Sequence, residues 1–320
     1  MPLLSFVVPV YRNEGTILPT AERIRAFVEG LGPSYRLELL FVDDGSDDGS
    51  PAELAQARAA DPRVGVLTLS RNFGQVLAVT EGLRRVRGDA AVVMSADLQD
   101  PVERLAGMVE AWNRGSRIVI GHRTSRDDGI LASAASRAFH RLVRISLPTI
   151  PEGGFDFLLL DRQALDTLNR FGGRNRFFQG DVLWLGFPTT FLPHVRERRP
   201  RGRSQWTLGK KMKYSLDGLL GTAYWPIRLM SLCGVVTALM GFAYAAAIVY
   251  AWARHSVPFE GWAPLMILIL VVGGVLMIML GVIGEYVWRI YDEVRGRPLV
   301  AVREFQAPGG PPGDGDRGEP

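Results

Sequence analysis

The stretch AVVMSADLQDP, residues 91–101, decides the fold, because it predicts a short buried strand that ends in a group of oxygen-bearing side chains. The apolar residues 91–94 are typical of a strand covered on both faces, as in a parallel sheet. In open α/β sheets, ligands bind beyond the carboxyl ends of such strands. If the chain stays extended, Ser95, Asp97 and Gln99 project to one side, because side chains alternate along a strand.

These three side chains offer a hydroxyl, a carboxylate and an amide carbonyl. Mg²⁺ and Mn²⁺ favour oxygen ligands, and Mg²⁺ usually takes only one or two carboxylates, with phosphate oxygens and water completing its shell. The alternative is a plain strand-to-helix turn, in which Asp100 and Pro101 open the next helix. The stretch by itself leaves both interpretations open.

The chain around this stretch alternates strand and helix patterns. Strands are predicted at residues 3–10, 37–42, 64–69, 91–94 and 116–121, and helices at residues 16–31, from Pro51, 75–86 and 101–113. Strands that alternate with helices of about a dozen residues require right-handed crossovers. The sequence therefore predicts an α/β fold with a mostly parallel sheet.

Polar residues follow two further strands. Asp43 and Asp44 end the second strand and fit a turn that binds ribose hydroxyls or a base edge. Alternatively, Ser46 or Asp47 only caps the next helix, and both interpretations can hold together. Arg71, in the loop after the third strand, could meet a phosphate, although a single loop arginine is more often solvated. These strand ends together suit a nucleotide diphosphate held through a metal ion.

Two later segments complete the globular part. Residues 153–160, GGFDFLLL, predict a strand with Asp156 embedded in it. Because an unpaired buried carboxylate is costly, we expect Asp156 to face a cleft or a cation. Residues 123–144 indicate a loop and a helix, and residues 175–186 a helix whose aromatic residues serve packing.

A basic segment, residues 194–213, precedes the apolar part of the chain. It contains many arginines and lysines against the single acid Glu197, and from Leu208 its apolar residues follow helical spacing. A basic amphipathic helix just before a membrane span is expected to lie among lipid headgroups. This location explains the net charge of +4 and the pI near 9.4 without a nucleic-acid partner.

Residues 229–253 and 261–284 carry no charge, and each run is long enough to cross a hydrocarbon core of about 30 Å. The short connection at residues 254–260 predicts a hairpin whose outer ends share one side. Basic residues flank those ends, which assigns that side to the cytoplasm. Four tryptophans stand near the ends of the spans, as expected at membrane interfaces: Trp225, Trp252, Trp262 and Trp288.

The expected organisation is a cytoplasmic catalytic domain at residues 1–200, a juxtamembrane segment at 201–225, a transmembrane hairpin at 226–290 and a cytoplasmic tail at 291–320, disordered from about 307. No cleavable signal peptide is expected, because a strand pattern begins at Leu3. Cys233 is the only cysteine, which excludes a disulfide or a cysteine zinc site within the chain.

A membrane-bound enzyme of this kind is expected to act on a lipid. If the lipid ends in a phosphate monoester, whose second pKa is about 6, it is already an anionic nucleophile at neutral pH, so a general base is helpful but not obligatory. The larger difficulty is to bring two anions together. A metal ion on the leaving diphosphate and arginines on the acceptor phosphate would meet it.

Six motifs, in order, carry a family resemblance: VVPVYRNE, FVDDGSDDGS, SRNFG, SADLQDP, GGFDFLLLDR and RGRSQW, followed by two apolar spans. The chain resembles the polyprenyl-phosphate glycosyltransferases of glycosyltransferase family 2 over nearly its whole length. The resemblance implies a Rossmann-like GT-A fold, a nucleotide-sugar donor, Mg²⁺ or Mn²⁺, and inverting transfer to a lipid phosphate. It also implies a multi-pass protein of the inner membrane that can assemble as a tetramer.

The resemblance assigns roles to residues by motif. The nucleotide-sugar site comprises Pro9, Tyr11, Glu14, Asp43, Asp44, Arg71, Ser95, Ala96 and Asp97. Asp97 and Gln99 match the metal ligands, and Asp156 matches the position often assigned to the base, which makes Asp97 and Asp156 the candidate catalytic residues. The lipid phosphate is assigned to Arg196, Arg198, Arg201, Arg203 and Ser204.

Two residues depart from the family pattern. Ser95 stands where the metal motif usually begins with Asp, and Leu158 stands where Arg is common. The first change shifts metal binding onto Asp97, Gln99 and the donor diphosphate, and the second removes a phosphate contact that the arginine-rich segment could replace. Two alternatives to a lipid-phosphate transferase therefore remain open. One is a transferase to a hydroxyl, for which Asp156 is indispensable, and the other is a catalytically silent membrane partner, which Ser95 favours.

Overall fold

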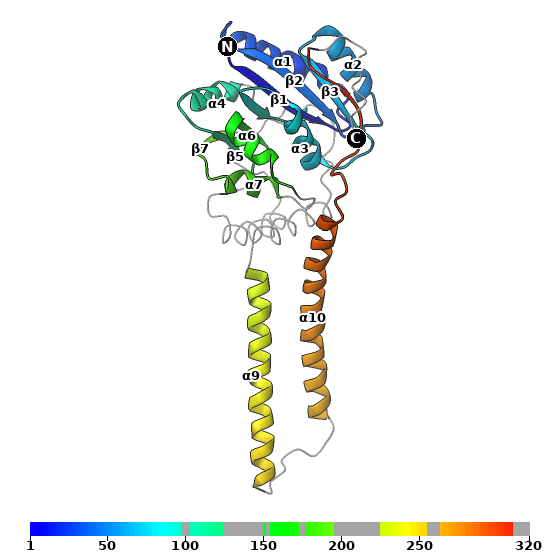
Figure 1. The fold of residues 1–320 in the computed structure, drawn as a ribbon, viewed down its shortest axis with the longest axis vertical. Coiled ribbons are helices and arrows are strands. Elements are labelled where there is room, and N and C mark those ends of the chain that lie inside the picture. Colours follow the sequence, from blue (N-terminus) through cyan, green and yellow to red (C-terminus); the bar gives the residue numbers. More distant parts are fainter. Residues whose placement is uncertain are drawn as a thin grey trace. The chain divides into compact units, whose positions relative to one another are not determined.

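The computed structural model describes residues 1–97, 103–123, 150–151, 154–172, 177–194, 225–254 and 263–309. The chain divides into two compact units (Figure 1). The first comprises Met1–Leu219 together with Pro298–Pro320, and the second comprises Leu220–Arg297.

Within the described residues, the first unit contains a sheet of eight strands in the order β7-β5-β6-β4-β1-β2-β3-β8. The strands are β1 (Leu3–Val10), β2 (Arg36–Asp43), β3 (Val64–Leu69), β4 (Ala90–Val93), β5 (Ile118–Arg123), β6 (Phe157–Asp161), β7 (Thr189–His194) and β8 (Val302–Gln306). The central strands β4, β1, β2 and β3 are parallel, as predicted. By contrast, β6 runs antiparallel to β4 and β5, and β8 runs antiparallel to β3.

Helices cover both faces of this sheet (Figure 1). They are α1 (Ile17–Gly30), α2 (Ser50–Ala60), α3 (Gln75–Arg85), α4 (Glu103–Asn113), α6 (Arg162–Asn169) and α7 (Phe178–Trp184). The side chains of successive strand residues point to opposite faces of the sheet and belong to two core clusters. Phe6 lies in the cluster that contains Leu105 of α4, whereas Val7 lies in the cluster that contains Leu83 of α3. Because both faces are buried, the central strands are almost wholly apolar, which is the pattern read at residues 91–94.

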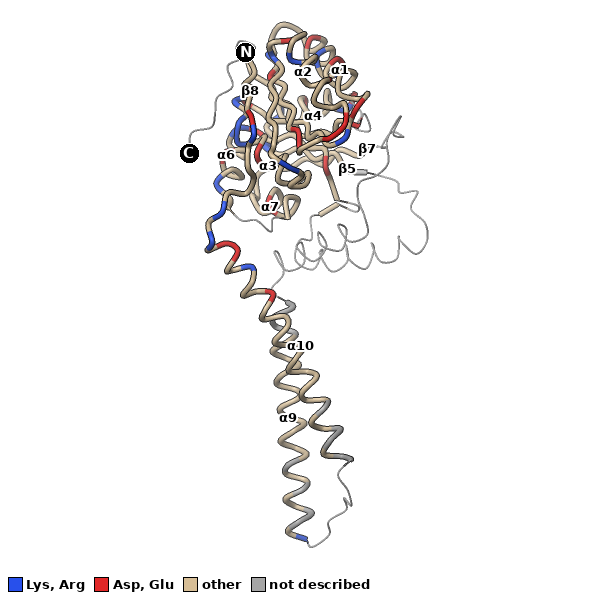
Figure 2. Tube along the Cα trace, turned by 90° about the vertical axis from the view of Figure 1, so that its right-hand side faces the viewer, with Lys and Arg blue, Asp and Glu red and all other residues tan. Residues whose placement is uncertain are grey.

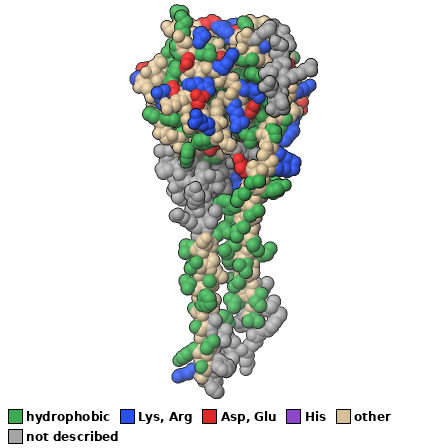
Figure 3. All heavy atoms as spheres, viewed as in Figure 1, with side chains coloured by type: hydrophobic (Ala, Val, Ile, Leu, Met, Phe, Trp, Pro, Cys, Tyr) green, Lys and Arg blue, Asp and Glu red, His purple; other side chains and the backbone are tan. Residues whose placement is uncertain are grey.

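The second unit contains α9 (Trp225–Ala253) and α10 (Ala263–Val294). Gly234 of α9 lies against α10, because a Cβ on this residue would be 3.2 Å from the Met279 Cε atom. Hydrophobic side chains lie exposed along both helices (Figure 3), and the described acidic and basic residues of α10 gather toward its C-terminal end (Figure 2).

One described segment, Val271–Val294 of α10, is long and apolar enough to cross a membrane, with a mean hydropathy of 1.9. In α9 the described apolar stretch is shorter, Met230–Tyr244. The predicted hairpin therefore has one span with the length and composition required, and its second span remains a prediction.

The chain after α10 returns to the first unit, which the sequence analysis did not anticipate. Strand β8 pairs with β3, and the Gly309 backbone N–H donates to the Pro62 carbonyl over 2.6 Å. The sequence analysis expected a cytoplasmic tail at residues 291–320, disordered from about 307, and predicted no strand there. The part of that tail after residue 309 lies outside the described residues.

Candidate active site

Four parallel strands bring their exit loops to one edge of the sheet. In the strand register, Val10 of β1 lies beside Asp43 of β2, Asp43 lies beside Thr68 of β3, and Val7 lies beside Val93 of β4. The predicted polar residues after β1, β2, β3 and β4 therefore meet at the carboxyl edge, where α/β sheets bind ligands.

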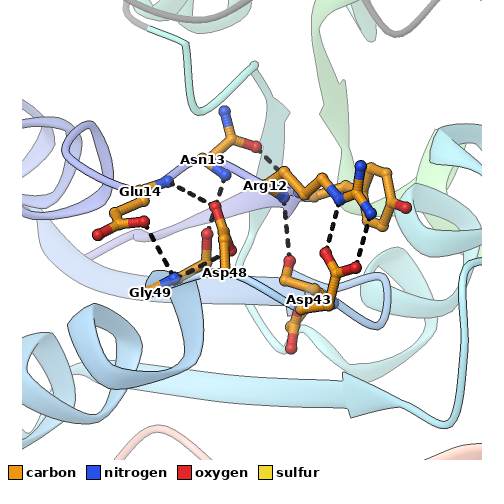
Figure 4. A network of polar contacts seen from close by, with 10 residues as sticks. Arg12, Asn13, Glu14, Asp43, Asp48 and Gly49 are labelled. Atoms are coloured by element: carbon orange, nitrogen blue, oxygen red, sulfur yellow. Dashed lines mark hydrogen bonds and ion pairs between the residues drawn. The ribbon is translucent and has the colours of Figure 1, made fainter.

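Arg12 ties the exit loop of β1 to that of β2 (Figure 4). Its guanidinium binds Asp47 through two hydrogen bonds of 2.6 Å, and its backbone N–H donates to the Ser46 Oγ atom. Arg12 has a φ of 55°, which is uncommon for a residue with a side chain. The guanidinium also lies 5.4 Å from the centre of the Tyr11 ring, so it holds this predicted nucleotide-binding residue in place.

Glu14, exposed at the same loop, contacts the start of α2 (Figure 4). Its Oε2 atom accepts a hydrogen bond from the Gly49 N–H, and its own N–H donates to the Asp48 carboxylate. Gly49 is the N-cap of α2 and no side chain caps it. The alternative that Ser46 or Asp47 caps this helix is therefore wrong, because Arg12 engages both residues instead.

The two adjacent carboxylates after β2 have different surroundings, although both are buried. Asp44 accepts hydrogen bonds from the N–H groups of Phe73 and Gly74, at 2.6 and 2.8 Å, and so joins this loop to the exit loop of β3. Asp43 accepts one from the Ser46 N–H at 2.9 Å. Burial raises the pKa of Asp43 above its usual range, although hydrogen bonds from Ser46 and the charge of Arg303 oppose that shift.

Gly45 allows these two exit loops to touch. It has a φ of +70°, and a Cβ at this position would lie 2.6 Å from the backbone carbon of Arg71. The exposed Arg71 side chain lies 4.1 Å from the centre of the Phe73 ring and donates to the Asn72 carbonyl. Arg71 therefore lies at the carboxyl edge of the sheet, where the nucleotide-sugar site is predicted.

After β4 the backbone does not stay extended as far as Asp97, which corrects the expectation for residues 95–97. The strand ends at Val93, and Ala96 and Asp97 form a turn. The turn nevertheless brings Ser95 and Asp97 together, because the Ser95 hydroxyl donates to the Asp97 Oδ1 atom over 2.9 Å. Asp97 is only 8% exposed. Gln99 lies outside the described residues.

The oxygen atoms of Ser95 and Asp97 fit a cation whose other ligands are substrate phosphates and water. Among the described residues, no group of three or more His, Cys, Asp or Glu side chains could hold a metal ion. One carboxylate beside a hydroxyl is instead the kind of protein contribution that suffices for Mg²⁺ bound to substrate phosphates. Asp97 therefore fits a metal ion that arrives with a diphosphate.

Asp156 lies in a bend just before β6 and is exposed, so the expectation of an embedded strand residue is wrong. Because β6 runs antiparallel to β4, with Leu158 beside Val93, the start of β6 lies at the same edge as Ser95. The loop before Asp156 is held by Gln179 of α7, whose buried side chain donates to the Phe155 carbonyl over 2.7 Å. Sequence reasoning missed Gln179, which stood within a predicted aromatic helix.

Position 158 belongs to the core and not to the site. Leu158 is fully buried in a core cluster, where its strand neighbours are Val93 and Ile120. The loss of a phosphate contact through the missing arginine remains a prediction. The residues predicted to bind the lipid phosphate, Arg196, Arg198, Arg201, Arg203 and Ser204, lie outside the described residues.

The chain is similar to known proteins along nearly its full length. The family model described as glycosyl transferase family 2 matches residues 5–173. An uncharacterized glycosyltransferase of Bacillus subtilis, YkcC, is 37% identical over 94% of this chain and 93% of its own length. The SfII prophage-derived bactoprenol glucosyl transferase of Shigella flexneri is 34% identical over 94% of this chain and 97% of its own length.

Solved structures share this type of fold over about 70% of the chain. Glucosyl-3-phosphoglycerate synthase from Mycobacterium tuberculosis, in complex with phosphoglyceric acid, has a TM-score of 0.51 at 20% identity and covers 69% of this chain and 80% of its own. Mannosyl-3-phosphoglycerate synthase from Rubrobacter xylanophilus has a TM-score of 0.51 at 18% identity and covers 71% and 74%. At these identities the likeness confirms the GT-A type of fold and nothing further.

Proposed function

Since the chain belongs to glycosyltransferase family 2, we propose that this glycosyltransferase carries a sugar from a nucleotide sugar to a polyprenyl phosphate. The observation that supports this best is the meeting of Asp43, Asp97 and Asp156 at one edge of the sheet, from the ends of β2 and β4 and the start of β6. The bactoprenol acceptor in the name of the Shigella relative supports a lipid phosphate.

The donor is proposed to lie along the carboxyl edge. Its nucleoside would contact Pro9, Tyr11, Glu14, Asp43, Asp44 and Arg71, and its diphosphate would lie near Ser95, Ala96 and Asp97. Tyr11 offers a ring already held by Arg12, and Asp43 offers a buried carboxylate that can accept hydrogen bonds from ribose or base. Because Asp44 already accepts two backbone hydrogen bonds, it would also hold the β2 and β3 loops together beside the nucleoside.

Asp97 and Gln99 are the proposed ligands of Mg²⁺ or Mn²⁺, which when bound would neutralise the diphosphate and stabilise it as a leaving group. Ser95 orients the Asp97 carboxylate by donating to its Oδ1 atom. The burial of Asp97 strengthens its electrostatic effect on a ligand, because fewer water molecules screen the charge.

The acceptor phosphate would attack from the side of Asp156. A phosphate monoester is largely dianionic at neutral pH and needs little help from a base, so Asp156 would take a proton only from the monoanion. Its exposed position leaves it accessible to a second substrate. The basic residues Arg196, Arg198, Arg201 and Arg203, with Ser204, would hold the acceptor, and direct displacement on the sugar would invert its configuration.

We further propose that α9 and α10 form a transmembrane hairpin in the inner membrane, with the catalytic domain in the cytoplasm. The exposed apolar side chains of both helices support this, since a soluble pair would leave a large apolar surface in water. Assembly into a tetramer remains a prediction from the family resemblance.

Purified protein in detergent tests the proposed function. It is incubated with Mg²⁺ or Mn²⁺ and a panel of UDP and GDP sugars, with and without undecaprenyl phosphate, and free UDP or GDP is measured. Lipid-dependent release from one donor is the expected result. Equal release with a hydroxyl-bearing lipid would favour the hydroxyl acceptor, and no release beside a working positive control would favour the silent partner.

A further inference from the structure

The segment after α10 is held firmly along the edge of the sheet. Besides the pairing of β8 with β3, the Ser70 N–H donates to the Ala301 carbonyl over 2.8 Å. At the other end, the Arg58 guanidinium donates to the Ala307 carbonyl over 2.9 Å, and the Arg87 guanidinium donates to the Pro308 carbonyl over 3.0 Å. Residues 301–308, here called the return strand, are therefore an ordered part of the first unit.

A bulge in this pairing singles out one residue of the return strand. Thr68 pairs with Glu304, and Leu69 pairs with Val302, so Arg303 has no opposite residue on β3. Bulges change the direction of a side chain and are common beside active sites. This bulge lies at the carboxyl end of β3, just before the loop that carries Arg71.

The Arg303 side chain is available for a ligand. It is exposed, and it makes no hydrogen bond or ion pair with any residue in the described part of the chain. Its charge nevertheless reaches Asp43: burial raises the pKa of Asp43, and Arg303 is among the groups that lower it. The strand register also places Arg303 near Asp43. Thr68 of β3 pairs with Asp43 of β2 on one side and with Glu304, the neighbour of Arg303, on the other.

The order of the strands says which part of a donor Arg303 would meet. The four strand spacings from β4 to β8, of about 4.8 Å each, separate Asp97 from the return strand by roughly 19 Å. A diphosphate held near Asp97 would direct the nucleoside toward β2 and β3. Arg303 would therefore lie at the nucleobase end, far from the phosphates.

We propose that Arg303 is a specificity-determining residue of the donor site, where its guanidinium donates hydrogen bonds to a carbonyl oxygen of the nucleobase. This inference rests on the proposed function. A guanidinium has only donors, so it suits uracil or guanine, whose edges carry carbonyl oxygens, and it disfavours the amino group of adenine. The donor site would then combine residues that precede the two apolar helices in the sequence with Arg303, which follows them.

Nucleotide binding to the full-length protein in detergent tests this inference. UDP, GDP and ADP are titrated in the presence of Mg²⁺ into the parent protein and into Arg303→Ala, Arg303→Lys and Arg36→Ala. Arg36 is a matched control, because it is exposed and starts β2 at the opposite end of the strand. Thermal unfolding of each variant checks the fold, which an exposed side chain should leave unchanged.

The parent protein is expected to bind UDP or GDP more tightly than ADP. Arg303→Ala should weaken binding of the preferred nucleotide about 10-fold, as for a hydrogen bond from a charged group, and binding of ADP less than about 2-fold. Arg303→Lys should give an intermediate loss, because it keeps the charge without the planar fork. Arg36→Ala should bind as the parent does.

Two results would overturn the assignment. Unchanged affinity in Arg303→Ala would place this residue outside the site, and an equal loss for all three nucleotides would show a general effect of charge without recognition of the base. If the parent protein binds none of the nucleotides, the proposed nucleotide-sugar donor fails together with the role of Arg303, and this outcome is distinct from both.

Discussion

The hydroxyl of Ser95 donates a hydrogen bond to the carboxylate of Asp97 over 2.9 Å, across the turn that follows β4. Ser95 occupies the position at which the family resemblance leads one to expect a second carboxylate. Among the described residues of this turn, one acidic side chain therefore stands beside a hydroxyl that orients it. Because Asp97 is the proposed cation ligand among the described residues of this turn, it is the sharpest target for mutagenesis.

Replacing Asp97 with Asn is expected to abolish sugar transfer, because it removes the only carboxylate among the described residues of the turn after β4. Loss of activity below detection, with thermal unfolding within a few degrees of the parent protein, is the predicted result. Radiolabelled sugar in the lipid fraction measures it. Substantial activity in this variant would exclude Asp97 as a metal ligand.

Replacing Ser95 with Ala is the matched control for the Asp97 variant. It keeps the carboxylate and removes only the hydrogen bond, which contributes about 1–2 kcal/mol when the acceptor is charged. We expect kcat/KM to fall about 10-fold. A loss as complete as that of Asp97→Asn would mean that the serine has a more direct part in the reaction.

Asp43 should make stability depend on pH. Its folded-state pKa is raised, mainly by burial, so the folded protein binds this proton more tightly than the unfolded chain does. The stabilising contribution is therefore present below the unfolded value of about 3.9 and is lost as the pH rises through the raised pKa. Asp43→Asn is uncharged throughout and retains an oxygen for the Ser46 N–H.

The Tm of Asp43→Asn should consequently exceed that of the parent protein at pH 7, and the difference should shrink toward pH 4. Transfer activity should fall in the same variant, because a carboxylate that we propose to contact the donor is lost. Scanning calorimetry at a series of pH values measures the first effect. A difference in Tm that is independent of pH would contradict a raised pKa.

Gly45 should not tolerate a side chain. Gly45→Ala would place a Cβ 2.6 Å from the Arg71 backbone, at a φ of +70°, and is expected to destabilise the fold by roughly 2 kcal/mol or more. Gly32→Ala is the control, because Gly32 also has a positive φ, of +89°, but a Cβ added there would have no neighbouring atom within 4 Å. Its cost should be only the backbone strain, about 1 kcal/mol. Urea unfolding measures the free energy lost by each variant. Equal losses for Gly45→Ala and Gly32→Ala would show that the exit loops of β2 and β3 can move apart without cost.

The basic segment should act on the acceptor alone. Neutralising Arg198 and Arg201 together is expected to raise the apparent KM for the lipid phosphate at least about 10-fold, as each lost charge-assisted hydrogen bond contributes about 1.5–3 kcal/mol. The KM for the nucleotide sugar should change less than about 2-fold. Steady-state kinetics with each substrate varied in turn measure both values, and equal changes would argue against an acceptor site there.

Much of the first unit could be predicted from local patterns. The apolar runs that became β1, β2, β3 and β4 are buried on both faces, and such burial leaves a continuous apolar signal in the sequence. The parallel order then places their exit loops at one edge. Asp43, Arg71 and Asp97 could be proposed for this reason, since Asp43 ends β2 and the other two lie in the loops after β3 and β4.

Other features could not be read from local patterns. The strand of residues 302–306 is half polar because it lies at an edge, so its sequence resembles that of a loop. Asp156 was placed inside a strand because an apolar run surrounds it, whereas the backbone bends at Asp156 and the strand begins one residue later. Gln179 and Arg12 act on distant loops through contacts that have no periodicity in the sequence.

Local patterns were sufficient to establish the class of fold, the family, the strand exits that carry the candidate site and the two apolar helices, because burial and strand-to-helix alternation are local properties of a chain. The folded chain was needed to establish that β6 and β8 run antiparallel, that Ser95 serves Asp97, and that Arg303 returns to the neighbourhood of Asp43. Such relationships depend on which distant segments pair and on the register in which they do so. That choice is made by packing over the whole unit and leaves little trace in any one segment.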